Sequence, residues 1–413
     1  MKCTVTHAVI DLGEVPAELP LRRRPVPYRA LLGALSAVLL VLAGGAARQR
    51  TAIAPTVIPA RLADTFILDG ERMHLVEGQR ITTYELPSMR VLTRTKAAAS
   101  GTVNSVELAG EAMVVGYQLD ANGTQDTAAY LAGGDRLLWR RPERLVATSA
   151  ADGIALLSGD RADIVVDLAT GRERWRVTQP ANGYIAEAGS GTGYPDWLVV
   201  LSDAGRLETY DAHTGRQLAA VPRADRAGVI WPVGSFLLVS AEGGYDAYRL
   251  PELRRLWHTE ADLSQSWMQN DCAGVICTFR QQSGMTVLDP ADGHVLWVSD
   301  RWAYAEPVGR YLLAVSSALE GDVPPLWVLD PRTGKQLGNF GAWRGLGLAP
   351  GGRFYGQREA GDRYQLYYGL LDPADRSVDV LGWADRVSNS CETGGGVLAC
   401  RLVDASVAVW PLR

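Results

Sequence analysis

The sequence predicts an all-β protein, a β-propeller of four-stranded blades preceded by one transmembrane helix. Three observations support this fold class: a short motif that recurs along most of the chain, a tryptophan at a fixed distance after that motif, and one uncharged apolar stretch near the N-terminus. The 413 residues are 47% hydrophobic and 21% charged, which is typical of a chain that folds. The net charge of -5 offers no basic surface for a phosphate backbone, so no nucleic-acid partner is expected.

The apolar stretch covers residues 30–47 and contains no charged side chain. At a rise of about 1.5 Å per residue, a helix of this length comes close to crossing the bilayer core. Arginines stand on both sides of it, and the larger group precedes it, at Arg22, Arg23, Arg24 and Arg29. This excess predicts a cytoplasmic N-terminus. A cleaved signal peptide, with small residues at 45–47 as the processing site, is the alternative.

The domain organisation follows from this topology. We expect a cytoplasmic tail over residues 1–29, a signal anchor over 30–47, a linker over 48–60 and the propeller over 61–413. The protein is thus expected in the plasma membrane as a single-pass protein, with the propeller outside the cytoplasm. The arginine-rich, lysine-poor composition favours an actinobacterial envelope.

Cysteine usage agrees with export. Cys3 falls on the cytoplasmic side, and the remaining cysteines form two close pairs outside, namely Cys272 with Cys277 and Cys391 with Cys400. Each pair flanks a turn-like stretch, so we expect two disulfides that staple hairpins. A zinc site is the weaker alternative because the pairs lack histidine neighbours and C-x2-C spacing. Buried free thiols remain the other alternative.

The recurring motif consists of an apolar strand, an aspartate, a turn and a second strand. Its clearest copies are VVDLATGRERW (165–175), TYDAHTGRQLA (209–219), VLDPADGHVLW (287–297) and VLDPRTGKQLG (328–338). Weaker copies keep the same register, so that eight markers run from Glu85 to Asp372 with a mean step of about 41 residues. A unit of this length suits one propeller blade of four short strands.

The motif residues are predicted to be structural rather than catalytic. The aspartate can accept hydrogen bonds from backbone N–H groups of the turn, the glycine can adopt a positive φ, and the tryptophan can bury a large apolar face between blades. We assign these roles to Asp167, Gly171, Trp175, Asp211, Gly215, Asp289, Gly293, Trp297, Asp330 and Gly334.

The arithmetic leaves the blade count open. Residues 61–413 correspond to about 8.6 units, so eight blades are favoured and seven or nine are possible. The last unit, around 407–412, lacks an outer strand. We expect the segment near TFIL (65–68) to supply it and to close the ring, because an unpaired strand edge would otherwise be exposed.

Copies such as VVDLATGRERW resemble the PQQ-like, or quinoprotein-type, propeller repeat, whose outer hairpin reads aliphatic-x-Asp-x-x-Thr-Gly-x-x-x-Trp. The resemblance covers most of residues 61–413. In enzymes of that family it implies a quinone held beside an adjacent-cysteine disulfide and a calcium ion. This sequence has no Cys-Cys dipeptide, so the resemblance does not extend to the quinone site.

No catalytic residue, cofactor or metal is predicted. The sequence lacks a nucleophile elbow, a zinc-protease motif and a phosphate-binding loop, and its exported histidines are scattered over different units. Calcium at Asp120, Asn122 and Asp126 is conceivable, but an EF-hand pattern is missing and a polar loop is favoured. Whether the protein is an enzyme stays open, and the sequence favours a non-enzymatic protein.

The expected function is that of a membrane-anchored binding or scaffold module for an envelope protein, a peptide or a glycan. The alternative is a quinone (PQQ)-dependent exported oxidoreductase. A third hypothesis is a sensor, whose short tail would need a cytoplasmic partner to signal.

Overall fold

The computed structural model describes residues 54–412, except for 98–100, 182, 190–192, 203–204, 223–228, 265, 269–271, 281–283, 318–322 and 362–363. The predicted tail (1–29), the predicted membrane helix (30–47) and the first part of the linker lie outside the described residues. Within the described residues, no helix has the length and apolar character needed to cross a membrane. The fold described below is that of the unit Ala52–Arg413.

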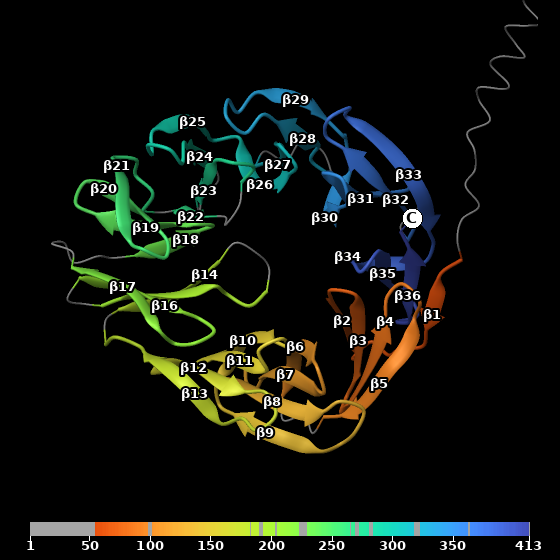
Figure 1. Cartoon of the computed structure of the whole chain (residues 1–413). Coiled ribbons are helices and arrows are strands. Elements are labelled where there is room, and N and C mark those ends of the chain that lie inside the picture. The colour runs from red at the N-terminus through yellow and green to blue at the C-terminus, as the bar shows by residue number, and fades with distance from the viewer. Residues whose placement is uncertain are drawn as a thin grey trace, which may run out of the picture. The chain divides into compact units, whose positions relative to one another are not determined.

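The described chain forms nine antiparallel sheets of four strands each. Figure 1 shows these sheets as the blades of a ring, with the first strand of each blade nearest the centre. The β-propeller predicted from the repeat is therefore confirmed. In eight blades the four strands are consecutive in sequence, as the motif indicates.

The strands follow one another in the order of the chain. Blades 1 to 3 contain β2 (Thr65–Asp69), β3 (Arg72–Glu77), β4 (Arg80–Glu85), β5 (Arg90–Lys96), β6 (Thr102–Ala109), β7 (Ala112–Gln118), β8 (Gln125–Leu131), β9 (Leu137–Arg141), β10 (Arg144–Ser149), β11 (Ile154–Ser158), β12 (Ala162–Asp167) and β13 (Glu173–Thr178). Blades 4 to 6 contain β14 (Tyr184–Ala188), β15 (Trp197–Leu201), β16 (Arg206–Asp211), β17 (Gln217–Pro222), β18 (Ile230–Val233), β19 (Phe236–Ala241), β20 (Gly244–Arg249), β21 (Arg254–Thr259), β22 (Ser266–Met268), β23 (Ile276–Arg280), β24 (Met285–Leu288) and β25 (Val295–Ser299). Blades 7 to 9 contain β26 (Trp302–Val308), β27 (Tyr311–Ser316), β28 (Leu326–Leu329), β29 (Gln336–Asn339), β30 (Arg344–Ala349), β31 (Arg353–Glu359), β32 (Leu366–Asp372), β33 (Ser377–Ala384), β34 (Val387–Gly394), β35 (Val397–Leu402) and β36 (Val407–Pro411), completed by β1 (Thr56–Ile58).

The ninth blade corrects the favoured count of eight, and the alternative of nine is right. Its outer strand is β1, which pairs antiparallel with β36 so that Val57 lies opposite Ala408. The blade has no motif because the motif sits between the third strand and an outer strand that follows it, and here the outer strand comes from the other end of the sequence. The ring is therefore closed by 56–58, inside the segment expected to be a linker, whereas TFIL (65–68) lies in β2, the inner strand of blade 1.

The blades pack face to face through apolar side chains. Between blades 2 and 3, for example, Val114 and Ala129 meet Leu157 and Ile164 in one buried cluster. A β-bulge interrupts the pairing of the third and outer strands just before the motif marker in seven blades, as at Val165/Val166. Such a bulge bends the outer strand and increases its twist, which suits a strand that wraps around the rim of a blade.

Candidate binding site on the channel wall

The motif aspartates are engaged by the turns that they precede. In blade 3, Asp167 Oδ1 accepts hydrogen bonds from the Thr170 backbone N–H at 3.0 Å and from the Thr170 hydroxyl at 2.9 Å. In blade 7, Asp330 accepts the equivalent bonds from Thr333 at 2.9 Å each. The Arg174 guanidinium and these turn hydrogen bonds lower the pKa of Asp167. Carboxylates held in this way stabilise turns and present no free acid or base.

Asp211 and Asp289 have the same kind of role. Asp211 Oδ1 accepts from the backbone N–H groups of His213 at 3.0 Å and Thr214 at 2.9 Å. Asp289 Oδ1 accepts from the Ala291 N–H at 2.9 Å. The four motif aspartates are thus placed in four separate blades and form no common site.

Each motif tryptophan packs on the turn of the next blade. Trp139, on the outer strand of blade 2, donates its indole N–H to the Leu168 carbonyl of blade 3 at 2.8 Å. A Cβ on Gly171, which has a φ of +65°, would lie 2.5 Å from the Trp139 side chain, so only glycine allows this approach. The same arrangement joins Trp175 to Gly215, Trp257 to Gly293 and Trp297 to Gly334. The indoles and turn glycines therefore connect neighbouring blades.

Both predicted disulfides are formed. Cys391 and Cys400 lie directly opposite each other on β34 and β35, as expected for a hairpin staple. Cys272 lies in the β22–β23 connection and is bonded to Cys277 on β23. The second bond therefore closes the connection of its hairpin instead of bridging two paired strands.

The remaining candidates from the sequence do not converge. Each described histidine contacts a side chain of the scaffold, in the pairs His74–Thr83, His213–Asp152, His258–Asp246 and His294–Asp292. Asp120 accepts hydrogen bonds from Asn122 and Thr124 within its own loop, and Asp126 forms an ion pair with Arg140. Within the described ranges, no cluster of three or more histidine, cysteine, aspartate or glutamate side chains could hold a metal ion.

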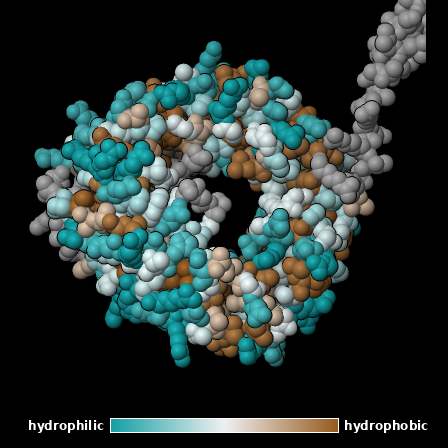
Figure 2. Space-filling view, in the orientation of Figure 1, coloured by the Kyte–Doolittle hydropathy of each residue, from teal (hydrophilic) through white to brown (hydrophobic). Residues whose placement is uncertain are grey.

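The inner strands at the centre of the ring carry charged and aromatic side chains that do not belong to the repeat motif. The inner strands surround an opening that Figure 2 shows as a hollow in this face of the molecule. The arginines of the described inner strands are paired, Arg144 with Glu187 at 3.8 Å and Arg344 with Glu359 at 3.6 Å. These two arginines are thus already engaged and do not neutralise the other acidic side chains of the inner strands, which form the channel wall.

Three inner-strand glutamates lie on different blades, at Glu107, Glu306 and Glu392. Burial raises the pKa of each one above its ordinary value, and for Glu107 it outweighs the opposing effect of the nearby Thr148 hydroxyl. Neither Glu306 nor Glu392 has an ion pair or hydrogen bond with any residue that the structure describes. The wall thus carries partly buried carboxylates that the scaffold leaves without a counter-charge.

A group of aromatic rings stands on the same wall, between blades 6 and 7. Trp267 on β22 stacks on the buried Phe279 of β23 with a centroid distance of 4.5 Å and an interplanar angle of 25°. Tyr304 on β26 lies 6.1 Å from Trp267 at 18° and 5.6 Å from Phe279 at 28°. Trp267 is 44% exposed and Tyr304 38% exposed, so two nearly parallel rings are open to a ligand. We call Trp267 and Tyr304 the aromatic wall.

The aromatic wall does not follow from the repeat pattern of the sequence. Trp267 lies ten residues after the motif tryptophan Trp257, outside the position that the repeat prescribes. That departure is the signal that could have identified it, because a tryptophan outside the blade-packing position has no structural role assigned by the repeat. Tyr304 carries no comparable signal.

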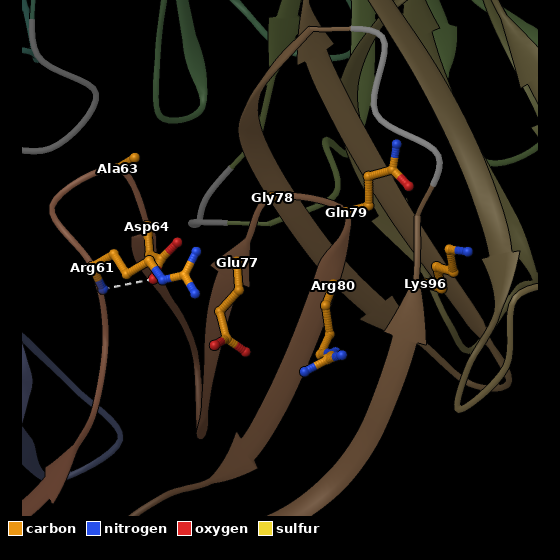
Figure 3. Close-up of a pocket in the computed structure, with 8 residues that line it drawn as sticks. All are labelled: Arg61, Ala63, Asp64, Glu77, Gly78, Gln79, Arg80 and Lys96. Atoms are coloured by element: carbon orange, nitrogen blue, oxygen red, sulfur yellow. Dashed lines mark hydrogen bonds between the residues drawn. The ribbon is translucent and has the colours of Figure 1, made fainter.

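A second hollow lies beside blade 1 and is shown in Figure 3. It has a volume of about 720 Å³ and is lined by Arg61, Ala63, Asp64, Glu77, Gly78, Gln79, Arg80 and Lys96. The Arg61 backbone N–H donates to Asp64 Oδ2 at 2.6 Å, and Arg80 lies opposite Lys96 in the β4–β5 register. Its lining mixes both charges and has no exposed aromatic ring, so it favours no single class of ligand.

The fold and the wall together define a nine-bladed β-propeller with a candidate binding site in its channel. No protein-family model matches the chain, and no curated protein matches it. Many solved structures are similar to it in fold, and three of them are a eukaryotic initiation factor, BamB and NirN.

The structure of a eukaryotic initiation factor is 11% identical in sequence to this chain and has a TM-score of 0.53. The match covers 82% of this chain and 89% of the initiation factor. BamB from Moraxella catarrhalis is 11% identical, with coverage of 87% and 98% and a TM-score of 0.44. The dihydro-heme d1 dehydrogenase NirN in complex with DHE is 15% identical, with coverage of 69% and 66% and a TM-score of 0.40. At these identities the likenesses concern the fold alone.

Proposed function

We propose that this protein is a membrane-anchored, extracytoplasmic propeller of the PQQ-like repeat class that binds an envelope protein, a peptide or a glycan. The observation that carries the proposal is the aromatic wall, because Trp267 and Tyr304 are exposed on inner strands while the motif tryptophans are used between blades. Exposed, rigid aromatic rings supply large contact areas at a low cost in conformational entropy and are enriched where proteins bind partners.

Binding is favoured over turnover by the way the polar side chains are used. Turns engage the motif aspartates, and scaffold side chains contact the described histidines. A catalytic site needs a nucleophile or an acid–base pair within hydrogen-bond reach of a common point. On the two strands that carry the aromatic wall, β22 and β26, the one carboxylate is that of Glu306. The anchor and the extracytoplasmic location rest on the apolar segment 30–47 and on the cysteine distribution.

The test compares three forms of the full chain immobilised on beads: wild type, the double variant Trp267→Ala/Tyr304→Ala, and the control Trp383→Ala. Trp383 lies on the outer strand β33 and is 48% exposed, so it matches Trp267 in type and exposure but not in position. Envelope proteins, peptides and glycans retained by each form are quantified by mass spectrometry. The proposal expects a component that wild type and the control retain and that the double variant loses.

Two results would contradict the proposal. One is equal retention of every component by the three forms. The other is saturable binding of pyrroloquinoline quinone with calcium, together with dye-linked oxidation of an alcohol or a sugar, which would identify an oxidoreductase instead.

A further inference from the structure

At two other places in this protein, one arginine side chain lies over a pair of aromatic rings. Arg301 stacks on Trp302 and on Trp327, with its guanidinium carbon 4.8 and 4.7 Å from the two ring centroids. Arg358 lies 5.7 Å from the Trp343 centroid and 5.6 Å from the Tyr367 centroid. A guanidinium over an aromatic face is attracted by the negative potential of the ring. At these two places an arginine of the protein satisfies that attraction.

The aromatic wall differs from both places. No arginine or lysine among the described residues stacks on Trp267 or Tyr304. The charged group that shares this region is a carboxylate, since Glu306 lies two residues after Tyr304 on β26 and therefore on the same face of that strand. The aromatic wall combines two partly exposed rings with a half-buried carboxylate, and both kinds of group attract a cation.

The surroundings favour a cation that belongs to a peptide. Each inner strand is the first of its sheet and pairs on one side only, so its other edge presents backbone N–H and C=O groups toward the channel. An extended peptide can satisfy such an edge while its side chains enter neighbouring pockets, which a small free cation cannot do. The inner-strand carboxylates Glu107 and Glu392 extend the negative character around the ring.

We propose that the aromatic wall and Glu306 receive an arginine or lysine side chain from a peptide segment of the binding partner. This inference rests on the proposed function and gives its ligand a chemical class. The cationic group would stack on Trp267 and Tyr304 as Arg301 stacks on Trp302 and Trp327, and the Glu306 carboxylate would neutralise its charge.

The test is a selection from a randomised peptide library on the immobilised full chain, followed by titration of the enriched peptides in solution. We expect enriched peptides with a basic residue at a fixed position, and an approximately tenfold rise in Kd when that arginine is replaced by citrulline or that lysine by acetyl-lysine. Trp267→Ala and Glu306→Gln should each weaken binding by about tenfold as well. Trp383→Ala, on the outer strand β33, is the matched control and should leave Kd unchanged.

The outcomes separate this inference from the proposed function. Enriched peptides without a basic residue, a neutral glycan whose retention on the beads depends on Trp267 but not on Glu306, or a selection that enriches nothing would each overturn the cationic-peptide inference. The first two results would leave a channel-binding function in place when Trp267→Ala abolishes binding. Binding that is indifferent to both Trp267→Ala and Glu306→Gln would overturn the inference and the proposed function together.

Discussion

Replacing Trp139 tests the contact that holds neighbouring blades together. This tryptophan is 7% exposed, packs against the turn of blade 3 and donates its indole N–H to the Leu168 carbonyl at 2.8 Å. Trp139→Ala removes the ring and leaves a cavity between two blades, whereas Trp139→Phe keeps most of the apolar surface and removes only the donor.

The expected losses follow from these two changes. Truncating a buried aromatic side chain to alanine lowers the free energy of unfolding by about 3 to 5 kcal/mol, because apolar burial is lost and the cavity collapses only in part. In Trp139→Phe the Leu168 carbonyl loses its hydrogen-bond donor, which costs about 1 to 3 kcal/mol. Trp383→Ala, on the exposed rim of blade 8, should change stability by about 0.5 kcal/mol or less.

Urea unfolding of the full chain, followed by far-ultraviolet circular dichroism, measures these differences. The expected order of stability is Trp383→Ala close to wild type, then Trp139→Phe, then Trp139→Ala. A Trp139→Ala variant as stable as Trp383→Ala would refute the conclusion that the motif tryptophans join the blades.

Three further predictions concern pH, the disulfide and topology. Burial raises the pKa of Asp163 to about 6, so the native state resists its ionisation and the free energy of unfolding falls as pH rises from about 3.8 through 6. Asp163→Asn should therefore raise the free energy of unfolding by up to about 3 kcal/mol at pH 8 and leave it unchanged near pH 3.5. Urea unfolding at both pH values measures the difference. Replacing both Cys391 and Cys400 by serine should lower the free energy of unfolding by about 2 to 4 kcal/mol, and a stability unchanged from wild type in urea would contradict the staple. A membrane-impermeant maleimide should label Cys3 only after permeabilisation of the cells, and labelling of intact cells would place the tail outside.

The repeat made most of the fold predictable from the sequence. Asp211, Gly215 and Trp175 predict a turn and the indole that packs on it, because both depend on local backbone geometry and on a spacing that recurs along the chain. Ring closure was harder to predict. Strand β1 has only three residues and pairs with β36 at the opposite end of the sequence, with Val57 opposite Ala408, so neither its length nor its composition distinguishes it from a linker.

The candidate site was less accessible to sequence reasoning. The side chains of Trp267 and Tyr304 belong to different blades and meet only because β22 and β26 are neighbouring inner strands of the closed ring. Their exposure also depends on how the neighbouring blades pack, and an apolar residue on an inner strand has the same sequence pattern whether it is buried or exposed. The disulfides were predictable because the spacing of the paired cysteines and their expected export both indicated them.

Photo-crosslinking in the native envelope distinguishes partners that bind at the channel wall from partners that bind on the rim. Benzoylphenylalanine is placed at Tyr304 in one strain and at Trp383 in another, and adducts are detected after irradiation of intact cells. We expect a discrete adduct from position 304 that disappears with Trp267→Ala, and none from position 383. A discrete adduct at position 383 with none at position 304 would contradict this expectation.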